Sequence, residues 1–285
     1  MTDIDRDEPE IHAGLEPAAD RVVVGGQPTL EQATISAEIA ERHRAVREDA
    51  SAAGRAVPVH PPRDFAPYRS TTLRHPTHEL VRAHPEEIEL VSPAFGHTDV
   101  AAEEGDLTIQ HTGEPLGERI IVTGRILDGD GRPVRNQLVE IWQANAAGRY
   151  VHKRDQHPAP LDPNFTGVGR VITGDDGGYR LTTIKPGAYP WKNHRNAWRP
   201  AHIHFSFFGS AFTQRLITQM YFPGDPLFAL DPIYQSIVDP AARERLVARY
   251  DHDVSEPEWA LGYRWDVVLT GSRATWMEPE DADHA

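Results

Sequence analysis

A run of ten residues, 198–207 (WRPAHIHFSF), constrains how this chain can fold more than any other feature. It places His202 and His204 two positions apart, with apolar residues between and after them. The side chains of a β-strand alternate between its two faces. A strand here carries His202, His204 and Ser206 on one face, and Ile203, Phe205 and Phe207 on the other. We therefore predict a strand whose apolar face enters a core and whose opposite face presents two imidazoles side by side, as a metal site requires.

The absence of cysteine narrows the available chemistry. None occurs among the 285 residues, which excludes disulfide scaffolds, thiolate ligands and thiol nucleophiles, so any metal must be held by nitrogen and oxygen. The formal net charge of −14 argues against nucleic-acid binding, because phosphate contacts need clustered Lys and Arg. No apolar run approaches the roughly 20 residues of a membrane span, and the acidic N-terminus lacks the apolar segment of a signal peptide. We expect a cytoplasmic protein that binds neither nucleic acid nor membrane.

The chain is rich in turn-forming residues, with 22 Gly and 24 Pro, which favours many short strands. Besides the histidine strand, apolar patterns predict strands over 120–127, 137–142, 179–184, 216–222 and 264–269. Asp-Gly pairs within 128–131 and 175–178 are typical of tight hairpin turns. The predicted fold class is all-β, an antiparallel β-sandwich core with an irregular N-terminal arm and a few short helices.

Four segments are expected along the chain: a polar N-terminal extension (1–56), an extended arm (57–116), the β-sandwich domain (117–276) and an acidic tail (277–285). Within the extension, Thr29 and Gln32 fit a capping box for a charged helix that ends near Ala53. A second helix is predicted from Asp239, as its N-cap, to Tyr250.

The histidine pair alone is a weak signal for a metal, because the chain has 15 histidines. Zinc and ferrous enzymes commonly hold their metal with histidines and a carboxylate together. The acidic residues nearest to the predicted strand, such as Asp225, form no recognisable ligand motif.

Two tyrosines are further candidates. Tyr150 follows Gly148 soon after the strand 137–142, and Tyr189 lies in a loop shaped by Pro and Gly before the histidines. Ionising a tyrosine of pKa near 10 at pH 7 costs about 4 kcal/mol, which direct ligation to a trivalent hard cation supplies. Two phenolates and two imidazoles suit ferric iron better than zinc. The alternative is that both tyrosines pack in loops with hydrogen-bonded hydroxyls, and spacing alone favours it.

Several separate motifs between 117 and about 274 carry a family resemblance. They are GERIIV (117–122), WQANA (142–146), GRY (148–150), LDPNF (161–165), IKPG (184–187), YPW (189–191), WRPAHIHF (198–205), LITQ (216–219), YF (221–222) and GDPL (224–227). This block, more than half of the chain, resembles the intradiol ring-cleaving dioxygenases, in particular beta chains of the protocatechuate 3,4-dioxygenase type. The resemblance implies a mononuclear non-haem Fe(III) enzyme that cleaves protocatechuate with O2 to 3-carboxy-cis,cis-muconate.

The resemblance also implies roles for individual residues. The ferric ligands are then Tyr150, Tyr189, His202 and His204. Tyr189 and His202 are axial in this arrangement, and Tyr189 leaves to accept a substrate proton. Arg199 is the implied catalytic residue, against the alternative of a surface salt bridge. The residues implied to bind substrate are Tyr68, Trp191, Gln219 and Ile233.

Two departures from the family pattern stand out. Val171 occupies a position, after an expected turn at 168–170, where the family often has cysteine. The first 55 or so residues extend beyond the family's usual start.

Other interpretations of the sequence stay open at this point. A catechol or hydroxyquinol 1,2-dioxygenase shares the implied ligands, and the predicted N-terminal helix keeps this alternative open, whereas the close match of the core motifs disfavours it. A non-catalytic β-sandwich binding module accounts for the strands but not for the Tyr and His constellation. The resemblance further implies a related alpha chain as partner in a hetero-oligomer.

Overall fold

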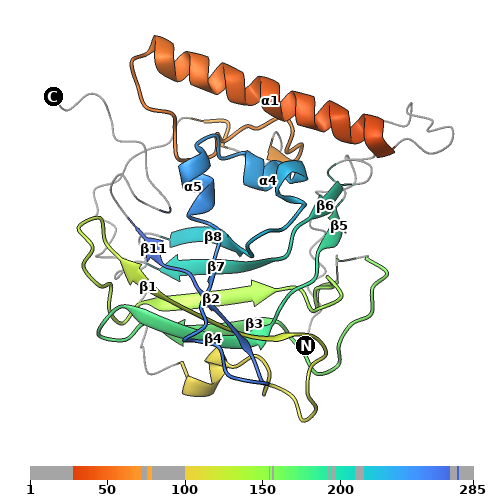
Figure 1. Ribbon diagram of the computed structural model, residues 1–285, viewed down its shortest axis with the longest axis vertical. Helices are drawn as coiled ribbons and strands as arrows, with labels where there is room; N and C mark the ends of the chain where they lie inside the picture. The colour runs from red at the N-terminus through yellow and green to blue at the C-terminus, as the bar shows by residue number, and fades with distance from the viewer. Residues whose placement is uncertain are drawn as a thin grey trace, which may run out of the picture.

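Two β-sheets form the body of the protein, and a long helix lies across one end of it (Figure 1). The computed structural model describes residues 28–71, 76–78, 100–153, 155, 157–191, 193, 197–208, 215–269 and 275. The predicted polar lead before residue 28, most of the arm after residue 71 and the acidic tail at 277–285 lie outside the described residues. Within the described ranges, no helix has the length and apolar character needed to cross a membrane.

The first sheet is built around β1 (Arg119–Leu127). β4 (Gly178–Ile184) pairs with β1 in antiparallel orientation, whereas β10 (Leu261–Arg264) and β11 (Val267–Val268) pair with it in parallel. β9 (Arg249–Tyr250) pairs antiparallel with β10 at the edge. The predicted sandwich is therefore confirmed, with two parallel pairings that the sequence did not indicate.

The second sheet is antiparallel throughout and has the order β3-β2-β7-β8. Its strands are β2 (Leu138–Gln143), β3 (Val168–Ile172), β7 (His202–Phe208) and β8 (Arg215–Tyr221). The turns expected at 128–131 and 175–178 form, but each connects strands of different sheets, β1 to β2 and β3 to β4. The turn expected at 168–170 is wrong, because these residues pair with β2 as part of β3.

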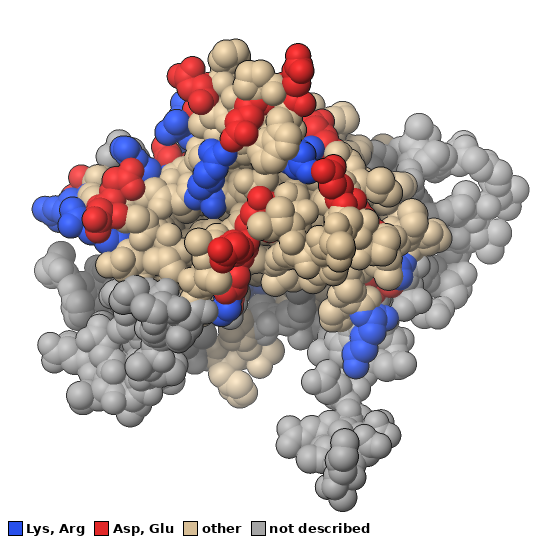
Figure 2. Space-filling model, turned by 90° about the horizontal axis from the view of Figure 1, so that it is seen from below, with Lys and Arg blue, Asp and Glu red and all other residues tan. Residues whose placement is uncertain are grey.

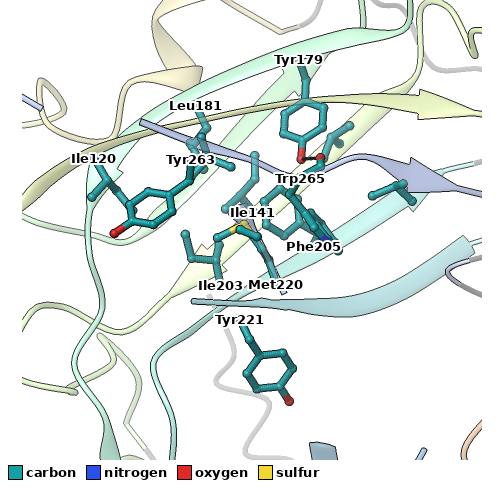
Figure 3. Packing of buried hydrophobic residues seen from close by; sticks show 14 of the residues in the cluster. Ile120, Ile141, Tyr179, Leu181, Ile203, Phe205, Met220, Tyr221, Tyr263 and Trp265 are labelled. Atoms are coloured by element: carbon teal, nitrogen blue, oxygen red, sulfur yellow. Dashed lines mark hydrogen bonds between the residues drawn. The ribbon is translucent and has the colours of Figure 1, made fainter. Parts of the chain in front are cut away.

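One hydrophobic core combines residues of both sheets. Ile120 from β1 and Leu181 from β4 belong to the same cluster as Ile141 from β2 and the apolar face of β7 (Figure 3). The side chains of β7 predicted for the core are all buried: Ile203, Phe205 and Phe207. Burying each side chain of this size stabilises the fold by roughly 1.5–3 kcal/mol. One face of β7 is thus anchored in the core, which leaves its histidine face for a site.

The last predicted strand is interrupted at Trp265. The sequence predicts one strand over 264–269, but the structure has two short strands, β10 and β11. Between them, the Trp265 N–H donates to the Thr123 carbonyl at 2.8 Å, and the Tyr179 hydroxyl donates to the Trp265 carbonyl at 2.7 Å (Figure 3). A Cβ on Gly124 would lie 1.7 Å from that carbonyl oxygen, so only glycine allows the two backbones to meet.

The predicted charged helix is confirmed as α1 (Pro28–Ala52). It starts one residue before Thr29, so Thr29 lies inside the helix instead of capping it. It ends before Gly54, whose φ of +64° is the left-handed conformation that commonly terminates helices. Ile35 and Ile39 are buried, whereas most side chains described on the helix are exposed.

The remaining helices are short: η2 (Ala102–Gly105), η3 (Phe228–Leu230), α4 (Pro232–Gln235) and α5 (Pro240–Glu244). α5 begins as predicted, with the Asp239 carboxylate accepting a backbone hydrogen bond of 3.0 Å. The prediction that it continues to Tyr250 is wrong. Tyr221, at the end of β8, exchanges two backbone hydrogen bonds of 2.8 Å with Leu246 and Ala248, which draws the chain out of the helix.

The end of the protein opposite α1 carries acidic and basic side chains interspersed with one another (Figure 2). Although the chain has a net charge of −14, this face is therefore not uniformly acidic. The described residues on this face form no basic patch of the kind that nucleic-acid binding requires.

Candidate metal centre

His202 and His204 lie side by side on the face of β7 that turns away from the sandwich core. Their Nε2 atoms are 3.2 Å apart. The sheet register puts His204 between Trp142 on β2 and Gln219 on β8. The Trp142 and His204 rings stack with centroids 4.9 Å apart, which fixes the plane of the imidazole. The strand and the stacked ring together hold both imidazoles in one orientation.

The backbone determines which nitrogen of His202 faces the site. Its Nδ1 lies 2.7 Å from the Pro200 carbonyl oxygen. A carbonyl only accepts hydrogen bonds, so Nδ1 carries the proton and Nε2 keeps its lone pair. Metal-ligating histidines are typically oriented in this way through their second nitrogen.

Two phenols converge on the imidazoles. Tyr189 begins β5 (Tyr189–Trp191), and its hydroxyl oxygen lies 3.4 Å from His202 Nε2. The Tyr150 ring stands edge-on to the Tyr189 ring with centroids 5.5 Å apart, and its centroid lies 6.3 Å from that of His204. All four side chains implied by the resemblance to be ligands therefore meet in one place.

The Tyr150 hydroxyl is buried and makes no hydrogen bond of good geometry among the described residues, although Tyr189 lies near enough to affect its pKa. Leaving such a group unpaired costs roughly 1–3 kcal/mol. This observation does not fit the alternative in which both tyrosines are packing residues with hydrogen-bonded hydroxyls. It does fit a hydroxyl oxygen that is completed by a bound ion.

Close backbone contact brings the two tyrosine loops together. Gly148 has a φ of +77°, and a Cβ there would lie 2.4 Å from the Ala188 carbonyl oxygen. The Gly187 N–H donates to the Asn145 carbonyl at 3.0 Å. The Asn145 side chain in turn accepts from the backbone N–H of Arg149 at 2.9 Å, which shapes the turn that leads to Tyr150. The WQAN and KPG motifs thus act as structural supports for the two phenols.

Burial controls the protonation of all four groups. Burial, and after it the Arg199 guanidinium, lower the pKa of His202 well below its ordinary value and the pKa of His204 to about 3. Burial, and after it the neighbouring Tyr189, raise the pKa of Tyr150 well above its ordinary value, and burial also raises the pKa of Tyr189. At pH 7 the imidazoles are therefore neutral donors and the phenols keep their protons until a cation binds.

This donor set narrows the kind of metal that fits. Among the described residues, no group of three or more His, Asp or Glu side chains is arranged to hold a metal, so a histidine–carboxylate site lacks its carboxylate here. Two neutral nitrogens and two phenols are the donors that remain. A hard trivalent cation suits such a set, because its high charge favours the ionised form of a bound phenol at neutral pH.

Arg199 ends β6 (Ala197–Arg199), which pairs with β5 so that Arg199 stands opposite Tyr189. Only 3% of its surface is exposed, which excludes the alternative of a surface salt bridge. Its Nη2 donates to the Gln219 side chain and, at 3.2 Å, to the Tyr221 hydroxyl. Burial by itself lowers the pKa of Arg199, but the Asp231 carboxylate and nearby phenols outweigh this and raise the pKa above its ordinary value.

Two residues that bind the Arg199 guanidinium, Asp231 and Tyr221, were not predicted from the sequence as its partners. Asp231 is fully buried, and its Oδ2 accepts from Arg199 Nε at 3.1 Å. Its Oδ1 accepts from the Ile233 N–H at 3.0 Å, so the same side chain caps α4. The Tyr221 hydroxyl donates to Gln219 at 2.8 Å, and in Figure 3 it points away from the rest of the core cluster. The pair Asp231-Pro232 was the one signal in the sequence, because Asp followed by Pro is typical of a helix start.

Of the four residues implied to bind substrate, Trp191 and Gln219 contact Arg199, and Tyr68 and Ile233 lie next to residues that do. The Tyr68 and Trp191 rings stand edge-on with centroids 5.1 Å apart, and the Arg199 guanidinium carbon lies 5.7 Å from the Trp191 ring. Gln219 contacts Arg199 directly, and Ile233 lies in α4 two residues after the aspartate that pairs with it. The structure thus groups these side chains around one cation.

Comparison with known proteins gives the family. Residues 90–271 match the family model described as Dioxygenase, and residues 54–86 match the one described as Protocatechuate 3,4-dioxygenase beta subunit N terminal. The protocatechuate 3,4-dioxygenase beta chain of Burkholderia cepacia is 57% identical over 223 residues, 78% of this chain and 94% of that protein. The chain belongs to the intradiol ring-cleavage dioxygenase family. As a member of a family of ring-cleaving enzymes, this intradiol dioxygenase is not the non-catalytic binding module that the strands alone allowed.

More distant relatives are also intradiol dioxygenases. The hydroxyquinol 1,2-dioxygenase of Rhizobium sp. (strain MTP-10005) is 32% identical over 167 residues, 53% of each protein, so the chain spans about half of that enzyme. The protocatechuate 3,4-dioxygenase alpha chain of Pseudomonas putida is 32% identical over 161 residues, 56% of this chain and 75% of that one. The solved 3-chlorocatechol 1,2-dioxygenase of Rhodococcus opacus 1CP gives a TM-score of 0.47 at 24% identity, with 59% of this chain and 65% of that chain covered.

Proposed function

We propose that this chain binds ferric iron and cleaves protocatechuate with O2 to 3-carboxy-cis,cis-muconate. The observation that carries the proposal is the meeting of two neutral imidazoles and two phenols around the unpartnered Tyr150 hydroxyl. The 57% identity to a protocatechuate 3,4-dioxygenase beta chain supports the choice of substrate. Tyr150, Tyr189, His202 and His204 hold the iron, which supplies Lewis acidity that makes the aromatic diol reactive toward O2.

Tyr189, Arg199 and Asp231 have separate roles in the proposed reaction. The substrate diol must lose protons to react, and we assign as an acceptor the Tyr189 oxygen at the start of the short β5 strand, which would be a phenolate once the metal is bound. Arg199 provides a fixed positive charge for the negative charge that develops on the substrate oxygens. Removing one such preorganised group typically lowers the rate about 10²–10³-fold. Asp231 keeps this arginine charged and oriented without contacting the ring.

The neighbouring side chains define the ring pocket. Trp191 and Ile233 provide apolar contacts that exclude water from the reacting ring. The Tyr68 hydroxyl and the Arg199 guanidinium are the groups suited to the carboxylate that distinguishes protocatechuate from catechol. Gln219 is bonded to both Arg199 and Tyr221, so it acts by orienting the arginine.

A second candidate is a hydroxyquinol or catechol 1,2-dioxygenase activity. The 32% identical hydroxyquinol enzyme and the long helix α1 favour it. The higher identity to the beta chain, over nearly that protein's full length, favours protocatechuate.

The beta-chain relationship also bears on assembly. We propose that a related alpha chain pairs with this one in a hetero-oligomer, which the similarity to both kinds of chain supports. Co-expression followed by size-exclusion chromatography tests this pairing, and a chain that elutes alone in the presence of its alpha chain contradicts it.

The decisive experiment is anaerobic addition of protocatechuate, catechol and hydroxyquinol to the iron-loaded protein, followed by visible absorption and then by product analysis after O2 is admitted. We expect a phenolate-to-iron colour before addition, the largest spectral change with protocatechuate, and the carboxymuconate as product. A colourless protein with bound iron contradicts the ligand set. Turnover of catechol or hydroxyquinol in preference to protocatechuate establishes the second candidate instead.

A further inference from the structure

The long helix α1 lies outside both stretches that match family models, which begin at residues 54 and 90. It is nevertheless attached to the rest of the protein. It runs across α4 and α5, on the same side of the sandwich as β8 (Figure 1). Two separate series of contacts connect α1 with Arg199, the buried arginine of the candidate site.

The first route passes through a hydrogen bond. His43, in the middle of α1, has its Nε2 2.7 Å from the Gln235 carbonyl oxygen. The carbonyl accepts, so His43 is the donor. Gln235 is the last residue of α4, and the N-cap of that helix is Asp231, the partner of Arg199. A helix of four residues has too few internal hydrogen bonds to be stable by itself, so contacts from outside must hold it.

The second route passes through an apolar cluster. Ile35 and Ile39 of α1 pack with Phe65, and Tyr68 packs against the same cluster. This cluster is separate from the sandwich core, so its role is local to this end of the protein. From Tyr68 the contacts continue to Trp191, whose ring faces the Arg199 guanidinium.

A side-chain clamp fixes the arm between these points. The buried Asn193, in the loop between β5 and β6, donates to the Pro67 carbonyl at 2.8 Å and accepts from the Arg69 N–H at 2.8 Å. The position of Tyr68 is therefore fixed by the hydrogen bonds of Asn193 to its two neighbours in the chain and by its packing against the cluster that contains the α1 isoleucines. Both pocket walls that α1 reaches, Tyr68 and α4, carry groups that the proposed function assigns to the substrate.

We propose that α1 is a brace within the chain that fixes Tyr68 and the Asp231–Arg199 pair, and so sets how strongly the pocket prefers a ring that bears a carboxylate. His43 and Ile39 are positioning residues in this proposal, because neither contacts the ring or a metal donor. The proposal rests on the proposed function, since it concerns the substrate preference of that same site.

The test compares four variants of the full chain, assembled with any alpha chain it requires. His43→Ala removes the donor to α4, and Ile39→Ala opens the apolar cluster. His43→Gln restores a side-chain N–H donor, and Arg44→Ala changes an exposed neighbour on α1. For each, kcat and KM are measured with protocatechuate and with catechol, together with iron content and the visible spectrum.

We expect His43→Ala to lower the ratio of kcat/KM for protocatechuate over catechol by about fivefold, the effect of one lost neutral hydrogen bond. Ile39→Ala should lower the ratio in the same direction, because it loosens the apolar cluster against which Tyr68 packs. KM should change more than kcat, and iron content and colour should stay as in the wild type. His43→Gln and Arg44→Ala should keep the wild-type ratio. If Ile39→Ala does not fold, Ile39→Val is used in its place, with a smaller change in the same direction.

An unchanged ratio in both His43→Ala and the Ile39 variant, with iron retained, overturns the brace while leaving the proposed function intact. Equal loss of activity on both substrates also overturns it, because it indicates a general structural effect. If the wild-type protein cleaves neither substrate, the proposed function itself fails. The two failures are therefore distinguished by the wild-type measurement.

Discussion

Replacing Asp231 by Asn tests how the site keeps a charged arginine buried. Asn retains the side-chain oxygen that caps α4 and the approximate volume of Asp, so it changes little besides the charge. Arg199, with 3% of its surface exposed, then loses the carboxylate that pairs with its Nε, and no other described carboxylate forms an ion pair with it. Breaking a buried ion pair from one side costs about 3–5 kcal/mol, because the remaining charge is uncompensated. We expect a loss of this size in the free energy of unfolding.

Urea unfolding followed by fluorescence measures the loss. The chain provides a matched control in Asp239→Asn, because Asp239 caps α5 in the same way, accepting from Ala241 N–H at 3.0 Å, and also precedes a proline. The control should change stability by less than about 0.5 kcal/mol. Turnover of Asp231→Asn should fall with iron retained, because Asp231 is not among the proposed ligands. If Asp231→Asn is no less stable than Asp239→Asn, the reasoning about the buried pair is refuted.

Three further predictions concern single features of the structure. Tyr150→Phe should weaken the phenolate-to-iron colour, because one of the two proposed phenolates is gone, and an unchanged spectrum in the iron-loaded variant removes this phenol from the site. The apo protein should also be stabilised by about 1–3 kcal/mol in thermal unfolding, because the poorly bonded buried hydroxyl is gone. Gly148→Ala forces the tyrosine loops apart, since its Cβ meets the Ala188 carbonyl oxygen at 2.4 Å, and should lower bound iron by at least tenfold at equal protein concentration; full iron content shows that the loops adapt. Glu104→Gln should lower the free energy of unfolding by up to about 1 kcal/mol above pH 5, because the hydrogen bond from Arg170 lowers the pKa of Glu104. This stabilisation is present above the unfolded pKa near 4.3 and is lost as the pH falls through the lower folded pKa. The stabilities of wild type and variant should therefore converge in acid, and a difference that stays constant with pH contradicts the assignment.

Local pattern was enough to predict the strand that carries the histidines. The alternation over 202–207 is set by the backbone of a single segment, and both the burial of Phe205 and the pairing of the imidazoles follow from it. The start of α5 was predictable for the same reason, since Asp239 and the following proline act within one turn. Its end was not, because a competing backbone partner, Tyr221, comes from a distant strand.

The convergence of the phenols depends on contacts that spacing does not contain. Tyr150 and Tyr189 are 39 positions apart, and they meet because Gly148 allows its backbone to touch Ala188. Spacing alone therefore favoured two packed tyrosines, and only the family resemblance indicated ligands. Asp231 was missed because its partner, Arg199, is brought to it by a hairpin and a helical turn that no local pattern connects.

β7 carries aromatic core residues on one side and the imidazoles on the other, so under the proposed function the correct folding of this strand is also a condition for taking up iron. A shift of the strand by one position would turn both rows around, exposing Phe205 and Phe207 to solvent and directing the imidazoles into the hydrocarbon interior. Chains with a misaligned strand would therefore lack the phenolate-to-iron absorption and would also be prone to aggregation. Iron uptake during refolding thus provides a direct count of the molecules whose sheet has assembled in the correct alignment.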